Sequence, residues 1–123
     1  MVAGDRVERD VAAMIPGRTW TWALNAEQSR KQLGQLGGDL QAFWAAEQAY
    51  EQSLPTKSAQ RVQAQLSAIH QLFQHLQADA RSLDEELSKG TPTRWHVNKD
   101  VLDMQKEIQR WRRLHQTIAA TLG

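Results

Sequence analysis

The fold is decided by residues 62–87, which read VQAQLSAIHQLFQHLQADARSLDEEL. Apolar side chains recur here at alternating intervals of four and three residues, at Val62, Leu66, Ile69, Phe73, Leu76, Ala80, Leu83 and Leu87. This spacing is the period of an α-helix with a single apolar stripe that packs lengthwise against other helices. We therefore expect a long amphipathic helix that begins near Thr56 or Ser58, either of which can cap it, and stops at Gly90.

The same spacing continues on both sides of this stretch. One such line of regularly spaced apolar residues, here called a seam, runs from Trp22 to Leu54 and ends at Pro55. Another seam runs from Val97 to Leu122. The connections between the seams are only a few residues long, which forces neighbouring helices to be antiparallel. The sequence thus predicts an all-α fold in which residues 18–123 form an elongated, coiled-coil-like antiparallel three-helix bundle. The alternative is a helical hairpin that dimerises.

Residues 1–17 are predicted to form a separate short helical segment. Val7, Val11 and Met14 follow helical spacing, and Pro16 and Gly17 end the pattern. We expect this segment to pack on one end of the bundle, as a lid over nearby tryptophans, or to be flexible.

Three glycines interrupt the first long seam. Gly34, Gly37 and Gly38 each cost a helix about 1 kcal/mol relative to alanine. Because the seam keeps its phase across them, we expect a continuous but weak or kinked helix. A loop between two shorter helices is the alternative, and close approach of another backbone would be the reason for glycine.

Composition excludes several classes of protein. The chain has 123 residues and no cysteine, which removes disulfides, thiol catalysis and cysteine-ligated metals. No apolar run approaches the roughly 20 residues of a membrane-spanning helix, and no signal peptide pattern opens the chain, so we expect a cytoplasmic protein without membrane insertion. A net charge of +1 gives no field that gathers nucleic acid. Since no catalytic or phosphate-binding motif is present, we expect neither an enzyme nor a cofactor.

Two ionisable residues interrupt otherwise apolar seams. Glu47 lies seven residues before Leu54, and His115 lies seven before Leu122, so parallel first and third helices place them in one layer. His70 of the middle helix is expected nearby. We interpret Glu47, His70 and His115 as a buried hydrogen-bonded layer that fixes the helix register. A pH-responsive or metal-binding layer is the functional version of the same hypothesis.

Aromatic and basic residues give the candidate partner surface. Trp20, Trp22, Trp95 and His96 are expected at one pole of the bundle, where they either bind a partner or lie under the N-terminal lid. Arg110, Arg112 and Arg113 surround Trp111 in the third seam, a mixture that suits a protein interface or weak nucleic-acid binding.

The pattern resembles a spectrin repeat. The resemblance rests on Leu40, Phe43 and Trp44 in the first helix, His70 in the second, and Trp111 followed by Leu114 in the third, and it covers roughly residues 33–122. It implies an elongated three-helix unit with both tryptophans in the core, of the kind that serves as a spacer and docking site in scaffolds.

From these features we expect a non-enzymatic scaffold or adaptor module that binds a protein partner or a second copy of itself. A small nucleic-acid-associated factor that uses the basic third helix is one alternative. A helical ligand-sensing domain is the other.

Overall fold

The computed structural model describes residues 2–14, 26–89 and 94–123. Within them every element is an α-helix and no strand occurs, so the predicted all-α class is confirmed. The helices are α1 (Val2–Met14), α3 (Ala26–Ser53), α4 (Thr56–Arg61), α5 (Gln63–Ser88) and α6 (Arg94–Leu122). None of the helices in this part of the chain has the length and hydropathy needed to cross a membrane.

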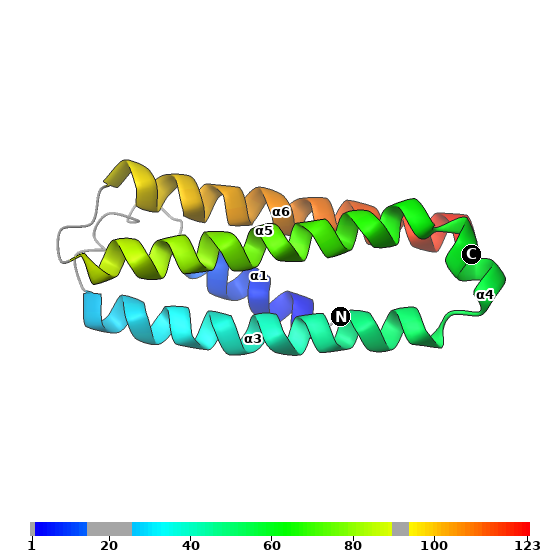
Figure 1. The fold of residues 1–123 in the computed structure, drawn as a ribbon, viewed down its shortest axis with the longest axis horizontal. Helices are drawn as coiled ribbons and strands as arrows, with labels where there is room; N and C mark the ends of the chain where they lie inside the picture. Colours follow the sequence, from blue (N-terminus) through cyan, green and yellow to red (C-terminus); the bar gives the residue numbers. More distant parts are fainter. Residues whose placement is uncertain (1, 15–25, 90–93) are drawn as a thin grey trace.

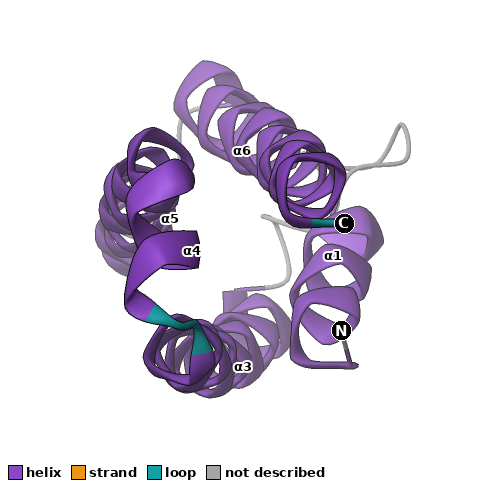
Figure 2. Cartoon of the chain, turned by 90° about the vertical axis from the view of Figure 1, so that its right-hand side faces the viewer, coloured by secondary structure: helices purple, strands orange, loops and turns teal. Residues whose placement is uncertain are grey.

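The long helices lie side by side in an elongated bundle (Figure 1). Helices α3 and α6 run in one direction, while α5 and α1 run in the other. Figure 2 shows the same helices end-on, with α1 beside α3 and α6, and α5 on the opposite side. We expected a bundle of three helices, and the structure adds the shorter helix α1 alongside the three long ones.

Helix α1 also lies elsewhere than expected. It runs lengthwise beside α3 and α6, over the half of the bundle where those two helices begin, and does not sit across one end (Figure 1). Val7 and Val11, which are one helical turn apart, are 0% and 1% exposed. A helix with one narrow apolar stripe buries more of that stripe in a groove between two helices than across a pole, which explains the difference.

The expected second helix is divided at Val62. Its φ of −115° and ψ of 19° leave the helical region and separate α4 from α5. Val62 is 0% exposed, whereas α4 has no buried residue and turns away from the α5 axis (Figure 1). The break lets Val62 enter the core while the polar turn before it stays outside. Neither Thr56 nor Ser58 caps the helix as we expected, because Pro55 holds the N-cap position without a side-chain hydrogen bond.

The glycines of α3 do not break it. The helix is continuous from Ala26 to Ser53, and a Cβ placed on Gly34, Gly37 or Gly38 would meet nothing within 4 Å. Continuity was predicted correctly, but close approach of another backbone is not the reason for these glycines.

A different glycine does make a close approach. A Cβ on Gly4 of α1 would lie 2.5 Å from Cη2 of Trp111. Because Gly4 lacks that atom, α1 can lie directly against the tryptophan ring.

The core follows the seams. The stripe predicted in residues 62–87 is buried at every position except Ala80, which is half-buried, and Leu72 widens the stripe on one side. The apolar residues of α3 and α6 that face this stripe include Leu36, Phe43, Val101, Met104, Ile108 and Ile118. Most of the bulky apolar side chains of the described helices are thus buried against one another in the core.

Candidate functional site

Trp111 of α6 lies at the centre of the bundle and links three helices. Its indole Nε1 donates a hydrogen bond of 2.8 Å to Oε1 of Glu47 on α3, and the far edge of its ring contacts Gly4 of α1. The ring of Phe43 meets it edge-on at 4.7 Å between centroids. Trp111 is 3% exposed, so this contact is a fixed part of the core and not a partner surface.

Glu47 and His115 lie in one layer. Nε2 of His115 is 2.7 Å from Oε1 of Glu47, and Glu47 is only 1% exposed. A carboxylate oxygen accepts hydrogen bonds, so the imidazole and the indole both donate to the same oxygen. Both donors come from α6, and the shared oxygen therefore fixes how α3 and α6 are aligned.

His70 does not join this layer. Its Nε2 is 2.6 Å from Oε2 of Glu51, about one turn beyond Glu47 on α3, and its imidazole is 45% exposed. The ring packs edge-on against Trp44, 5.2 Å between centroids. The three-residue layer is wrong in this respect, because the register of α5 against α3 brings His70 to the surface beside Glu51. The remaining Glu47 and His115 are too few for a metal site.

An apolar patch lies on the outer face of α6. Trp95 is 64% exposed and Leu102 is 47% exposed, and they are the large hydrophobic residues that stay exposed in the described chain. They lie seven positions apart, which is close to two helical turns, so they share one face of the helix. His96 packs edge-on against Trp95 at 5.0 Å, and its Nδ1 lies 3.7 Å from Oε2 of Glu86.

The described part of α1 leaves Trp95 uncovered. Its high exposure means that residues 2–14 do not form the predicted lid over this ring. The remaining members of the predicted patch, Trp20 and Trp22, lie outside the described residues.

The three arginines have different roles. Arg112 pairs with Glu8 and, at 3.0 Å, with Asp5, both on α1, and these partners raise its pKa. Its guanidinium also lies 5.7 Å from the ring centroid of Trp111. Arg112 therefore fastens α1 to the bundle and is not available to a partner. Arg110 and Arg113 are exposed, with no ion pair among the described residues.

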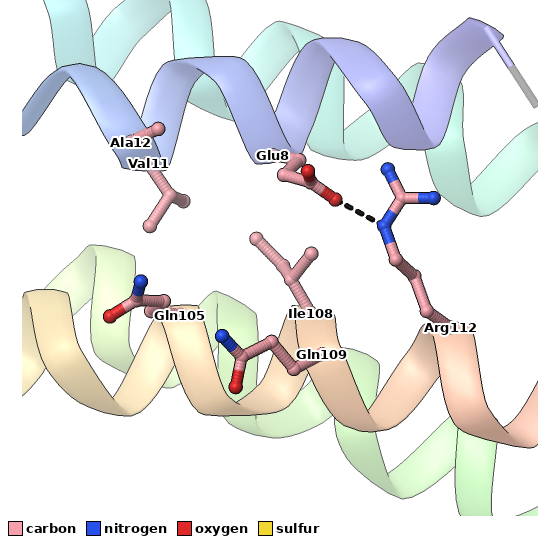
Figure 3. A pocket seen from close by; sticks show the side chains of 7 residues that line it. All are labelled: Glu8, Val11, Ala12, Gln105, Ile108, Gln109 and Arg112. Atoms are coloured by element: carbon pink, nitrogen blue, oxygen red, sulfur yellow. Dashed lines mark hydrogen bonds and ion pairs between the residues drawn. The ribbon is translucent and has the colours of Figure 1, made fainter.

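A pocket lies where α1 meets α6 (Figure 3). Val11 and Ala12 of α1 face Gln105, Ile108 and Gln109 of α6, and the Glu8–Arg112 pair closes one end, as Figure 3 shows. Its volume of about 180 Å³ is below the roughly 300 Å³ at which ligand pockets begin. We interpret it as imperfect packing of α1 and not as a substrate site.

Carboxylates with raised pKa values gather at two helix interfaces. Between α1 and α3, burial and hydrogen bonding to Asp39 raise the pKa of Asp10 to about 7. Between α5 and α6, burial and the neighbouring Asp79 raise the pKa of Glu107 to about 8. Burial likewise raises the pKa of Asp79.

A fourth carboxylate shares the second interface. Burial raises the pKa of Asp100, and the Ser82 hydroxyl and Lys99 only partly offset this shift.

Sequence reasoning missed both groups, because their members are far apart in the chain. A signal was nevertheless present for the second. Asp100, Asp103 and Glu107 follow the spacing i, i+3, i+7, which places them on one face of α6. Basic residues outnumber acidic ones in that helix, so its charge pattern indicated only a basic surface.

The comparisons with known proteins add no relative. No protein-family model matches the chain, and neither a curated protein nor a solved structure matches it. The resemblance to a spectrin repeat therefore stays a prediction, and the function must be inferred from the site itself.

Proposed function

We propose that this chain is a non-enzymatic helical adaptor or scaffold module that binds a protein partner through the outer face of α6. The observation that carries the proposal is the exposure of Trp95 and Leu102 on one helical face. Exposed tryptophan is costly in solution and is the residue type most enriched at the energetic centres of protein interfaces. The cytoplasmic location expected from the sequence belongs to the same proposal.

The charges beside this patch indicate the kind of partner. Lys106, Arg110 and Arg113 follow Leu102 along the same side of α6, all three exposed and none in an ion pair within the described ranges. An amphipathic segment with acidic side chains complements this surface, because its apolar residues can cover Trp95 and Leu102 while its carboxylates meet the three cations.

The conformation of Trp95 supports a role as an anchor. The edge-on contact with His96 restrains the indole while leaving most of its surface open. A side chain that is already restrained loses less conformational entropy on binding than a free one. Most of the free energy gained when a partner covers the Trp95 ring can therefore appear as affinity.

The alternative of a nucleic-acid-binding factor has less support. Arg112 pairs with two carboxylates of α1, so the basic run offers Lys106, Arg110 and Arg113 at most. Three phosphate contacts give weak binding that salt removes readily. The small pocket between α1 and α6 likewise gives little support to a ligand sensor.

The proposal is tested by affinity capture with matched variants. The double variant W95A/L102A removes the apolar patch, and Q71A/Q74A alters two exposed positions of α5 as its control. Both change surface side chains, so both should keep stability within about 0.5 kcal/mol of the wild type. We expect a partner that the wild type and Q71A/Q74A capture equally and that W95A/L102A captures at least tenfold less. Equal capture by all three proteins contradicts the proposal.

A further inference from the structure

Four carboxylates converge where α5 packs against α6. Asp79 comes from α5, and Asp100, Asp103 and Glu107 come from successive turns of α6. Asp79, Asp100 and Asp103 each offer one carboxylate oxygen such that the three oxygens lie within 4.8 Å of one another. Oxygens on opposite sides of one Ca²⁺ ion are roughly 4.6–5.2 Å apart, since each Ca–O distance is about 2.3–2.6 Å. The three side chains can therefore reach a single ion from their present positions.

Asp100 supplies an observation that clustering alone does not. The residue is only 6% exposed, yet its Oδ2 is buried without a hydrogen-bond partner among the described residues. Asp79 and Glu107, by contrast, hydrogen-bond to each other across the α5–α6 interface, and this bond does not involve Asp100. Buried polar oxygens are nearly always satisfied in folded proteins, by a donor, a water or an ion. The unpartnered Oδ2 of Asp100 therefore indicates that a positively charged or donating group belongs beside it, within the cluster of Asp79, Asp100 and Asp103.

The nearby cations do not fill this role. Nζ of Lys99 binds Oδ2 of Asp103 at 3.1 Å, and Nδ1 of His75 is 3.9 Å from Oε1 of Glu107. Neither is a partner of Asp100 Oδ2.

We propose that Asp79, Asp100 and Asp103 bind a hard divalent cation between α5 and α6. A set made only of carboxylate oxygens suits Ca²⁺, Mg²⁺ or Mn²⁺ and not the softer Zn²⁺ or Cu²⁺. Water completes the coordination, and Lys99 releases Asp103 when the ion binds. With three protein ligands, the site is expected to bind at roughly 0.1–1 mM, the range of weak calcium modules. A bound ion ties α5 to α6 and thereby stabilises the helix that carries the proposed partner surface.

The test measures binding of the metal alone to the full chain. Mn²⁺ binding is followed by the loss of the free-ion EPR signal, and thermal unfolding is recorded with and without 10 mM Ca²⁺ at matched ionic strength. We expect one Mn²⁺ per chain and a rise in Tm of about 5–10 °C with Ca²⁺, which follows from a ligand present at about ten to a hundred times its Kd.

Two variants locate the site. D103N removes the more accessible ligand, so it should fold, and it should bind Mn²⁺ at least tenfold more weakly than the wild type. D84N alters an exposed carboxylate of α5 outside the cluster and should bind as the wild type does. The proposal is overturned if the wild type binds no Mn²⁺ at 5 mM, or if D103N binds as tightly as D84N. It is also overturned if NaCl raises the Tm as much as Ca²⁺ does, because that result indicates general screening.

Discussion

Replacing Gly4 by alanine should weaken the attachment of α1, although the same replacement elsewhere in the protein should strengthen a helix. The new Cβ would lie 2.5 Å from Cη2, 3.0 Å from Cζ3 and 3.1 Å from Cζ2 of Trp111. Ordinary contacts between carbon atoms are about 3.5–4.0 Å, so α1 or the ring must move by about 1 Å. The ring is held by Glu47 and Phe43, which leaves α1 as the part that shifts.

The magnitude follows from a comparison with Gly34→Ala. Alanine favours a helix over glycine by about 1 kcal/mol, and at Gly34 nothing lies within 4 Å to oppose that gain. At Gly4 the same kind of gain is opposed by overpacking, which costs about 1–3 kcal/mol. We therefore expect Gly34→Ala to raise the free energy of unfolding. The free energy of unfolding of Gly4→Ala should be lower than that of Gly34→Ala by about 1–3 kcal/mol.

The assay is equilibrium urea unfolding monitored by circular dichroism, with hydrogen exchange of residues 2–14 as a second readout. Faster exchange in α1 of the Gly4→Ala protein, with the other helices unchanged, means that α1 has undocked from Trp111. If Gly4→Ala stabilises the protein as much as Gly34→Ala and leaves α1 protected, the close contact between α1 and Trp111 does not exist.

Three further predictions concern other contacts. Folding raises the pKa of Asp10 from 3.8 to about 7, so the folded state holds a proton that the unfolded state releases, and stability should fall as pH rises through this interval. Asp10→Asn should remove that part of the pH dependence in thermal melts, whereas an unchanged slope argues against a shared proton with Asp39. Trp111→Phe removes one donor to buried Glu47 and should cost about 1–3 kcal/mol in urea unfolding, and a neutral effect would show that the bond is unimportant. Lys106→Glu should reduce binding of a captured partner at least tenfold at low salt without changing Tm, and stronger binding would mean that the partner is not acidic.

The long helices could be predicted because one physical signal dominated them. Seven of the eight stripe positions predicted in residues 62–87 are buried. In the first seam, the unchanged phase across the glycines correctly indicated a continuous α3. The spacing of Glu47 and His115 placed them in one layer, where a hydrogen bond of 2.7 Å joins them. Periodicity works here because each helix buries one face along its whole length.

Other features depend on contacts that periodicity does not encode. The pattern passes through Val62 without a change of phase, so nothing local indicated that the helix bends there. The groove taken by α1 depends on Gly4 fitting against Trp111, a contact between residues more than a hundred positions apart. Arg112 could be interpreted as a partner residue until its carboxylate partners on α1 were located.

The outer face of α6 can be tested directly by site-specific photo-crosslinking. A benzophenone amino acid is placed at the exposed Lys99, which lies between Trp95 and Leu102 on the same face of α6, and, as the control, at the exposed Gln74 of α5. We predict that the Lys99 position crosslinks to a distinct acidic protein in native lysate, that excess wild-type chain competes for it, and that W95A/L102A does not. If both positions give the same products, or if the variant competes as well as the wild type, α6 is not the partner surface.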